Sequence, residues 1–464
     1  ANLSLSHRGP DDGGIYKDDK LNIGIGHRRL SIIDTSSFGH QPMLSNDGKT
    51  ILVFNGEIYN YKELRSDLKR KGFSFQGKSD TEVLLYAYIH WGEDCLKRLN
   101  GMFSFLIFDS KKNEIFVARD RFGIKPLYYF KKDGALYFGS EIKQFSGLQC
   151  WSANLNKRMA FDYLNWGQTD HTNETLFEGV FQVPAGSFCK FNVFDPESDL
   201  VFQSWYQIES KISEINYEKA VSDFRNIFQK SVKRRLRADV PIGTCLSGGL
   251  DSSSIACTIN NQINKNQPQL TFSSCSKEKK YDEFEYVEEI LKSYSNIESH
   301  RIEVEHQNFW NEIDHIIYHH DEPFLSPSVY AEWSIFKRVK SSKVKVTLDG
   351  HGADEILYGY YTFFGPLLST KLRKFKIFSY LIEMINIKKL HNYNLFRLMG
   401  MSIRSFIPSF FKEYLYKILN MPTDHSDWIN HQALGNPQSK FEFNDKNIYL
   451  TSKDQLLKFS VPKQ

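Results

Sequence analysis

The sequence has few cysteines, no long hydrophobic run and little net charge. Its six cysteines are irregularly spaced, which is not the pattern of a disulfide framework or a zinc ribbon. No apolar stretch approaches the roughly 18 residues that cross a bilayer. The formal net charge of +4 is small for 464 residues, and lysine is spread along the chain. We therefore expect a protein of the reducing cytoplasm, without a membrane or a nucleic acid as partner.

The most informative segment is a Ser/Gly-rich run that follows an apolar stretch, 240–246, and opens a helix-like one. It reads Leu246-Ser247-Gly248-Gly249-Leu250-Asp251-Ser252-Ser253. Adjacent glycines let a backbone approach an anion, serine hydroxyls donate hydrogen bonds, and a helix N-terminus attracts negative charge. Asp251 would repel phosphates unless a cation lay between them, so the run predicts Mg²⁺ with a nucleotide. It is not a Walker A loop, which needs a lysine after the second glycine. A Ser/Gly turn that caps a helix is the structural alternative.

This run resembles the pyrophosphate loop of the ATP pyrophosphatases, which split ATP between its α and β phosphates. A second run resembles the next ATP-site segment of the asparagine synthetase family, and it reads Val346-Thr347-Leu348-Asp349-Gly350-His351-Gly352-Ala353-Asp354-Glu355, followed by Gly359-Tyr360. Asp354, paired with Asp251, could hold one Mg²⁺ against the leaving pyrophosphate. Taken alone, the second run is also compatible with a Gly-rich turn before a helix. The resemblance implies that ATP is bound by Leu246, Ser247, Gly248, Gly249, Asp251, Ser252, Ser253, Asp349 and Gly350, with Ser274 as a weaker candidate for the adenine or ribose.

The first part of the chain resembles the glutaminase domain of the same synthetases. The motifs that carry this resemblance are His7-Arg8-Gly9-Pro10-Asp11, Gly26-His27-Arg28-Arg29, Phe54-Asn55-Gly56-Glu57-Ile58-Tyr59-Asn60 and Ser79-Asp80-Thr81-Glu82. The resemblance implies that glutamine is bound by Arg29, Asn55, Gly56, Glu57 and Asp80. Asn55 and the Gly56 amide would form an oxyanion hole, in which each donor stabilises the intermediate by roughly 3 kcal/mol. Arg29 would pair with the α-carboxylate and Asp80 with the α-ammonium group. Asn55-Gly56 alone is also a strong hairpin-turn signal.

The resemblance implies two domains of α/β and α+β class. Residues 1–206 would form a layered αββα N-terminal-nucleophile glutaminase fold. Residues 207–464 would form a doubly wound parallel-sheet ATP-pyrophosphatase fold of the adenine nucleotide α-hydrolase type. The patterns agree, because short β-rich runs with two helices, 61–71 and 81–91, fill the first part. Strands and helices then alternate from about residue 217. Expected strands lie at 50–54, 103–108, 114–118, 135–138, 188–193, 270–274, 300–304 and 344–348, and expected helices of the second part at 220–236, 282–294, from 309, and 330–339.

Three features depart from the family pattern. The family's nucleophile is a cysteine at the start of the mature chain, whereas this sequence starts at Ala1 and has no cysteine before Cys95. Residues 456–464 resemble the approach to the segment that completes the aspartate pocket, and that segment does not follow. We expect the sequence to be truncated at both ends. His351 stands where the family carries glutamate or glutamine linked to adenylate formation, and it is either catalytic or a solvated turn histidine.

Two further stretches admit two interpretations each. Asp321-Glu322-Pro323-Phe324 resembles the family's loop near nucleotide and acceptor, and it also fits a Pro-bounded helix linker. Basic, aromatic-rich helical stretches at 375–387 and 403–419 could lie on a membrane. Packing at the edge of the synthetase domain explains them more simply.

The function implied is glutamine-dependent, ATP-dependent amidation of aspartate to asparagine through a β-aspartyl-adenylate, releasing AMP and pyrophosphate. Glutamine, aspartate and ATP would be the small-molecule partners, Mg²⁺ the metal, and a homodimer the assembly. Adenylation is needed because a carboxylate is a poor electrophile, and excluding water protects the mixed anhydride. The alternatives are an amide ligase of the same scaffold for a sugar acid, peptide or β-amino acid, and a degenerate nucleotide-binding protein.

Overall fold

The computed structural model describes residues 1–208, 215–264, 266–279, 282–406, 429–430 and 433–435. The chain divides into two compact units, Ala1–Ala153 with Val180–Gly350 and Asn154–Gly179 with His351–Gln464. The domain boundary predicted near residue 206 falls inside the first unit and remains a prediction. The segment expected to approach the aspartate pocket, 456–464, lies outside the described residues.

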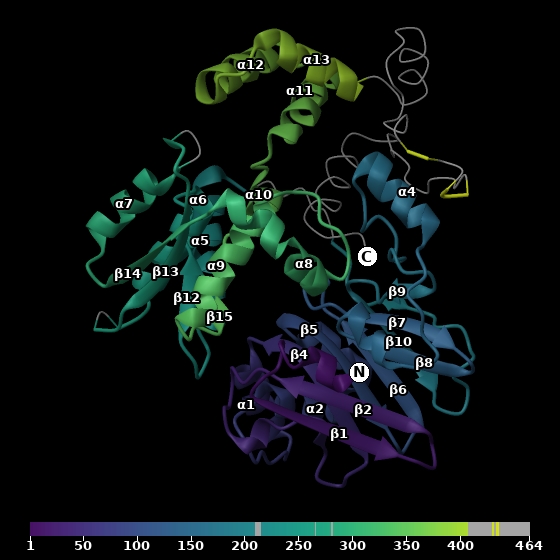
Figure 1. Ribbon diagram of the computed structural model, residues 1–464. Helices are drawn as coiled ribbons and strands as arrows, with labels where there is room; N and C mark the ends of the chain where they lie inside the picture. Colours follow the sequence, from purple (N-terminus) through teal and green to yellow (C-terminus); the bar gives the residue numbers. More distant parts are fainter. Residues whose placement is uncertain (209–214, 265, 280–281, 407–428, 431–432, 436–464) are drawn as a thin grey trace. The chain divides into compact units, whose positions relative to one another are not determined.

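A six-stranded antiparallel sheet forms the centre of the N-terminal part of the first unit (Figure 1). Alternate residues of its strands enter two different cores, because side chains of a strand point to opposite faces. In β4, Leu52 and Phe54 join one core and Ile51 joins the other. The sheet is therefore covered on both faces. Its strand order is β11 (Gln203–Ser204), β10 (Ser187–Asn192), β6 (Glu114–Arg119), β5 (Gly101–Asp109), β4 (Thr50–Ile58) and β3 (Met43–Leu44).

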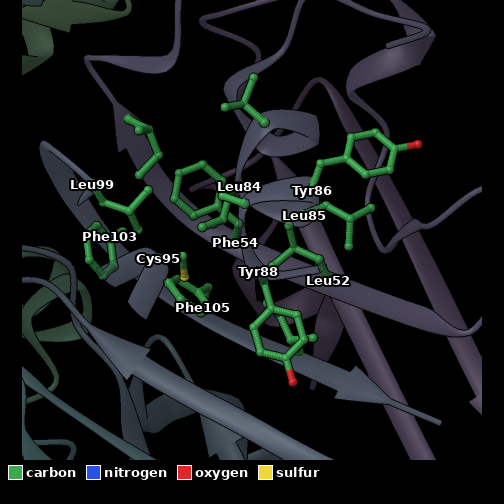
Figure 2. Close-up of a cluster of buried hydrophobic side chains, with 14 of the residues drawn as sticks. Leu52, Phe54, Leu84, Leu85, Tyr86, Tyr88, Cys95, Leu99, Phe103 and Phe105 are labelled. Carbon is green, nitrogen blue, oxygen red and sulfur yellow. The ribbon is translucent and has the colours of Figure 1, made fainter. Parts of the chain in front are cut away.

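Helices α1 (Tyr61–Arg70), α2 (Asp80–Trp91) and α3 (Cys95–Arg98) cover the first face. Figure 2 shows side chains of α2, such as Leu84, beside Phe54 of β4 and Phe105 of β5. α2 is buried continuously from Asp80 through Tyr88. Ser79 fixes the start of this helix, since its hydroxyl accepts the Glu82 N–H at 3.2 Å.

Two smaller antiparallel sheets cover the second face. One is the hairpin of β1 (Asp12–Asp18) and β2 (Ile23–Arg29), and the other has the order β8 (Ala135–Gly139), β7 (Tyr128–Lys132) and β9 (Val180–Gln182). Ile25 and Leu127 pack from this side against Ile51, Phe108 and Val117 of the large sheet. The prediction of a layered helix and sheet domain is confirmed.

A four-stranded parallel sheet organises the rest of the first unit. Its order is β14 (Ile297–Glu303), β13 (Gln269–Cys275), β12 (Ile242–Cys245) and β15 (Val346–Thr347). Helix α9 (Ser328–Ser341) packs on Phe272 through Val339. Val232 of α5 and Val287 of α7 belong to separate hydrophobic clusters. A parallel sheet with packed helices was predicted, and this prediction is confirmed. The other helices of this part are α5 (Tyr217–Arg235), α6 (Leu250–Asn260), α7 (Phe284–Ser293) and α8 (Phe309–His320).

The second unit is helical in its described part. Tyr380 and Met384 of α12 and Leu398 of α13 pack with Leu368 of α11, which confirms packing for the predicted stretch 375–387. Most of the predicted stretch 403–419 lies outside the described residues. Among the helices that the structure describes, none has the length and apolarity of a membrane span. The helices of this unit are α4 (Lys157–Trp166), α10 (Ala353–Leu357), α11 (Phe364–Arg373), α12 (Ile377–His391) and α13 (Leu395–Phe406).

Candidate functional site

The predicted glutamine-site residues gather at the edge of β4 that faces away from β5. The N–H of Phe54 donates to Gln41 Oε1 at 2.7 Å, and the N–H of Ile58 donates to Asp80 Oδ2 at 2.9 Å. Because the direction of N–H groups repeats every second residue in a strand, the Gly56 N–H points to the same edge, between these two side chains. The Asp80 carboxylate and the Gly56 N–H therefore lie along the same edge of β4.

Gly56 is required by its surroundings. A Cβ at this position would lie 2.1 Å from the Met102 carbonyl oxygen and 2.7 Å from Phe103 Cα. Asn55 and Gly56 both lie inside β4, where they pair with Ser104 and Phe103 of β5. The alternative interpretation of Asn55-Gly56 as a hairpin turn is therefore wrong.

The side-chain amide of Asn55 is a prepared donor. Its Nδ2 is buried and has no hydrogen-bond partner among the residues that the structure describes. Leaving a buried donor unsatisfied costs about 1–3 kcal/mol. A ligand oxygen at this point would remove that cost, which is the chemistry expected of an oxyanion hole.

Two buried carboxyl groups, Glu57 and Asp80, lie close together at this site. Burial, and then the negative charge of Asp80, raises the pKa of Glu57 to about 7. Burial raises the pKa of Asp80 to about 6, although the backbone N–H groups of Ile58 and Thr81 and the charge of Arg29 oppose the rise. A cationic ligand would favour the ionised form of both carboxyls. The pair thus fits an ammonium group.

Arg29 holds the turn that follows β2. Its guanidinium is buried and donates to the carbonyl oxygens of Ser36, at 2.8 Å, and of Asp34. A Cβ on Gly39 would collide with Arg29 Nη2 at 1.8 Å, so the guanidinium fills the space below this turn. Arginine has five N–H donors, so these contacts leave others for a ligand carboxylate.

The predicted phosphate loop connects β12 to α6. The Ser247 N–H donates to Ser252 Oγ at 3.2 Å, and the Gly249 N–H donates to Ser247 Oγ at 3.3 Å. Gly248 has φ +86°, and a Cβ there would lie 2.9 Å from Tyr286 Cβ. This backbone conformation requires glycine. The hydroxyl of Ser253, in the first turn of α6, is buried without a partner among the described residues.

The second predicted ATP segment lies against this loop. Asp349 accepts the Cys245 N–H at 3.0 Å and the Thr347 hydroxyl at 2.8 Å, which ties β15 to β12. A Cβ on Gly350 would lie 3.1 Å from both Asp251 Cβ and the Ser252 nitrogen. The two segments therefore meet at the carboxyl edge of the parallel sheet. The structural alternatives, which treat each segment as an isolated turn, do not account for this meeting.

Ser274 is exposed at the end of β13. Cys245 of β12 pairs with Phe272 of β13, and continuing this register by two residues places Ser274 beside Ser247. The two serines therefore border the same edge.

The sequence comparisons match both parts of the chain. Residues 1–204 match a glutamine amidotransferase domain family, and residues 223–441 match an asparagine synthase family. The chain is 36% identical over 367 residues to Bacillus subtilis "Asparagine synthetase [glutamine-hydrolyzing] 1", covering 79% of this chain and 56% of that protein. A Methanocaldococcus jannaschii protein named for the same activity is 33% identical over 380 residues, covering 78% of this chain and 72% of that protein. The chain belongs to the glutamine-hydrolysing asparagine synthetase family.

This synthetase-family chain spans little more than half the length of the Bacillus relative, 56%. It is also 29% identical over 380 residues to "Amidase chry2" of Gibberella zeae, covering 79% of this chain and 55% of that protein. This chain is therefore similar in sequence both to proteins named asparagine synthetase and to one named amidase.

Two predicted residues of the synthetase part, His351 and Asp354, belong to the second unit, whereas Asp251 belongs to the first. Their joint action remains a prediction. In the described part of the chain, no group of three or more His, Cys, Asp or Glu residues is placed to hold a metal. Mg²⁺ bound with nucleotide needs only one or two carboxylates, because phosphates and water supply the other ligands. Asp251 and Ser253, both in the first turn of α6, carry oxygen donors of the kind that Mg²⁺ binds.

His27 and Gln41 border the edge of β4 where the predicted glutamine-site residues gather, and the sequence analysis did not predict either as a site residue. His27 Nε2 lies 3.2 Å from the Phe54 carbonyl oxygen. Burial lowers the pKa of His27 to about 4, so the ring is neutral at pH 7. The position of His27, two residues before Arg29 in one strand, could have indicated that both side chains lie on the same face of that strand.

An open hollow of about 580 Å³ beside Ser204–Gln207 contains none of the predicted site residues.

Proposed function

We propose that this chain carries the glutamine-binding and ATP-binding sites of an enzyme that transfers the amide nitrogen of glutamine to the side-chain carboxylate of aspartate. The observation that carries the proposal is the buried, unsatisfied Asn55 Nδ2 beside the Gly56 amide and the Asp80 carboxylate. Together with Arg29, these groups match the three polar regions of a glutamine, and the Ser247–Gly249 loop would bind an anion.

In the glutamine site, Arg29 would bind the α-carboxylate, Asp80 and Glu57 would bind the α-ammonium group, and Asn55 with Gly56 would stabilise the oxyanion. The family's nucleophile is an N-terminal cysteine. Cys95 does not replace it, because Cys95 is fully buried and burial raises its pKa to about 12. The residues named here would therefore bind glutamine and stabilise the oxyanion, and Cys95 would take no part.

In the synthetase site, the Ser247–Gly249 loop and the first turn of α6 would hold the phosphates of the substrate ATP. Asp251 and Asp354 would hold Mg²⁺, which when bound screens the phosphate charge. Asp349 keeps β12 and β15 in register below this loop. The aspartate carboxylate would attack the α-phosphate and displace pyrophosphate, and ammonia would then displace AMP.

A second candidate is an amide ligase for another carboxylate. His351 in place of the family's glutamate or glutamine favours it, since a histidine cannot reproduce a carboxylate at every pH. The six free cysteines fit the cytoplasm as the site of either reaction. A homodimer is the assembly we propose.

Isothermal titration calorimetry tests both sites on the chain as it is. We expect L-glutamate, the product of the glutaminase step, to bind with 1:1 stoichiometry, and Asp80→Asn to weaken it at least about tenfold through loss of a charged partner. We expect ATP to bind with Mg²⁺ and Asp251→Asn to remove the Mg²⁺ dependence. Mass spectrometry of mixtures with ATP, ammonium and candidate acids then identifies the acceptor. Failure of both ligands to bind would overturn the proposal.

A further inference from the structure

The side chain of His27 lies in the layer between strands β2 and β4. Alternate residues of a strand share a face, and Ile25 of β2 and Ile51 of β4 pack in the same core. His27 is two residues after Ile25, and Asn55 is four residues after Ile51. Both side chains therefore extend from their strands into the layer in which this core lies.

The contact of His27 with Phe54 fixes where the proton of the ring lies. His27 Nε2 is 3.2 Å from the Phe54 carbonyl oxygen, and a carbonyl oxygen can only accept, so Nε2 carries the hydrogen. The ring is neutral at pH 7, because burial lowers the pKa of His27 to about 4. Nδ1 therefore has no hydrogen and is an acceptor. The Phe54 carbonyl points to the same edge of β4 as the Gly56 N–H, which places the ring beside that amide.

The site thus holds a donor and an acceptor that complement each other. Asn55 Nδ2 and His27 Nδ1 are both buried, and neither has a hydrogen-bond partner among the residues that the structure describes. The backbone of Phe54 cannot satisfy them, because its N–H donates to Gln41 and its carbonyl oxygen accepts from His27. A primary amide would satisfy both atoms at once, since its oxygen accepts and its nitrogen donates.

Glu57 supplies another acceptor on the same face of β4 as Asn55. Its Oε1 is also buried without a hydrogen-bond partner in the described part of the chain. The negative charge of Asp80 acts on this carboxyl and, together with burial, raises the pKa of Glu57 to about 7. Two neighbouring carboxyls suit a cation better than a neutral amide. His27 Nδ1 is then the acceptor that remains for the amide nitrogen.

The backbone of His27 is held by the segment that precedes β1. Asn2 Nδ2 donates to the His27 carbonyl oxygen at 3.3 Å. Arg28 Nε donates to the Gly9 carbonyl oxygen at 3.0 Å. This segment is therefore attached to β2 on both sides of residues 3–8, and His27 is fixed through its backbone as well as through its ring.

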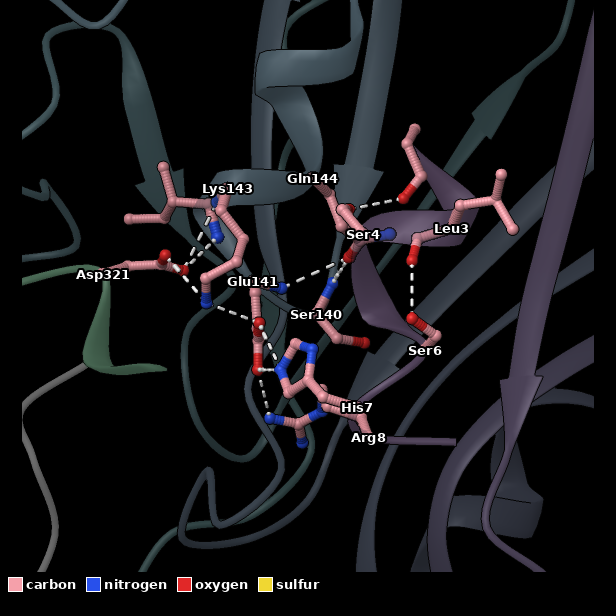
Figure 3. A network of polar contacts seen from close by, with 12 residues as sticks. Leu3, Ser4, Ser6, His7, Arg8, Ser140, Glu141, Lys143, Gln144 and Asp321 are labelled. Carbon is pink, nitrogen blue, oxygen red and sulfur yellow. Dashed lines mark hydrogen bonds and ion pairs between the residues drawn. The ribbon is translucent and has the colours of Figure 1, made fainter. Parts of the chain in front are cut away.

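Buried ion pairs fix the same segment between these two attachments (Figure 3). Glu141 accepts hydrogen bonds from Arg8 Nη1 at 2.9 Å and from Lys143 Nζ at 2.6 Å, and His7 Nε2 lies 3.2 Å from the same carboxylate. Lys143 Nζ also lies 2.9 Å from Asp321 Oδ1. The side chains of Lys143, Glu141 and Asp321 are at most 9% exposed, so these pairs hold more firmly than surface pairs do. The fold itself therefore sets the position of the strand that carries His27.

We propose that His27 makes this site specific for a primary amide, with Nδ1 accepting a hydrogen bond from the side-chain NH₂ group of glutamine. The inference rests on the proposed function, because Asn55 and Gly56 hold the oxygen of the same amide. A carboxylate oxygen in the place of the NH₂ group has no hydrogen to donate and meets the lone pair of Nδ1. The site therefore disfavours glutamate relative to glutamine.

Isothermal titration calorimetry on the whole chain tests this role with L-glutamine and L-glutamate. The two ligands have the same α-ammonium and α-carboxylate groups, so the ratio of their affinities depends on the side-chain end alone. We expect the unmodified protein to bind glutamine more tightly by about tenfold or more. His27→Gln keeps a nitrogen donor for the Phe54 carbonyl and removes the acceptor at Nδ1, so the ratio should fall by about tenfold.

Two further variants are matched to this one. His27→Asn places its oxygen near the position of Nδ1 and loses the donor to Phe54, so it should keep the ratio within about threefold of the unmodified value. His90→Gln makes the same substitution at an exposed histidine in the last turn of α2, and it should keep the full ratio. Thermal denaturation shows that each variant is folded.

The outcomes separate this inference from the proposed function. If the unmodified protein binds both ligands equally, or if a folded His27→Gln keeps the full ratio, the role of His27 Nδ1 is overturned while the proposed function stands. Equal loss of the ratio in His27→Gln and His27→Asn also overturns it, because the acceptor at Nδ1 would then make no difference. If neither ligand binds the unmodified protein, the proposed function fails and the inference fails with it.

Discussion

The Asp80 carboxylate accepts the backbone N–H of Ile58 at 2.9 Å, which joins the first turn of α2 to the edge of β4. The same carboxylate accepts its neighbour's N–H, from Thr81, at 3.0 Å. Asp80 is therefore held rigidly beside the Gly56 amide before any ligand arrives. Such prior ordering reduces the entropy that binding must overcome.

Gly56→Ala should prevent stable folding of the N-terminal part. The new methyl group would meet backbone atoms of Met102 and Phe103, which cannot move without breaking the pairing of β4 with β5. We expect a loss of roughly 3 kcal/mol or more in the free energy of unfolding, measured by urea denaturation. Gly24→Ala, in strand β2, is the control because its added Cβ meets nothing within 4 Å. Equal stability of the two variants would contradict the steric argument.

Asn55→Leu should raise stability while it abolishes oxyanion stabilisation. The substitution replaces a buried unsatisfied donor by an apolar group of similar size, and we expect a gain of about 1 kcal/mol in the free energy of unfolding. Thermal denaturation measures the gain. Calorimetry with L-glutamate, whose γ-carboxylate oxygen would accept from the Asn55 amide, measures the functional effect as a loss of affinity. A lower melting temperature would show that Nδ2 already has a partner.

Glu57→Gln should flatten the fall of stability with rising pH. The pKa of Glu57 is raised to about 7 in the folded protein, above its ordinary value of 4.5. The folded state therefore favours the protonated form of Glu57. The contribution of this group to the stability of the fold is complete below pH 4.5 and is lost as the pH rises through 7. The difference in the free energy of unfolding between the two proteins should change by at most about 3 kcal/mol over this range. Asp67→Asn, on the exposed side of α1, should leave the pH profile unchanged.

Gly248→Ala should weaken nucleotide binding more than Gly249→Ala. Gly248 has φ +86°, and an added Cβ would lie 2.9 Å from Tyr286 Cβ. Gly249 has φ −65°, and its added Cβ would meet only the Ser247 hydroxyl at 3.3 Å. An L-residue in the left-handed region costs roughly 1–2 kcal/mol, so the loop should leave its binding conformation. Calorimetry with Mg²⁺ and ATP compares the two variants. Similar affinities would mean that the loop can bind in another conformation.

The sequence was sufficient for the fold class because its signals are local. Alternating residues predicted strands of the two larger sheets, although the hairpin of β1 and β2 and strand β7 were not predicted. The Ser/Gly run was expected to lead from a strand into a helix, and it lies between β12 and α6. The predicted ends differ by only a few residues, as for the strand expected at 344–348, which spans Val346–Thr347.

Long-range contacts limited what could be predicted of the sites. Asn55-Gly56 has the local chemistry of a turn, and only the approach of β5 shows why a glycine is needed inside a strand. Likewise, Asp321 was noted for its own loop, while its partner Lys143 lies far away in sequence. His27 became informative only when its ring was found against the Phe54 carbonyl.

β3 pairs with only two residues of β4, so the backbone N–H groups of Phe54 and Ile58 have no strand partner on that edge. Gln41 and Asp80 occupy these groups at Phe54 and Ile58 with side chains instead of backbone. These two side chains thus take the place of a neighbouring strand and satisfy donors that would otherwise be buried without a partner. Loss of either side chain would leave a buried backbone donor of β4 unsatisfied, so the strand would lose stability together with the candidate site.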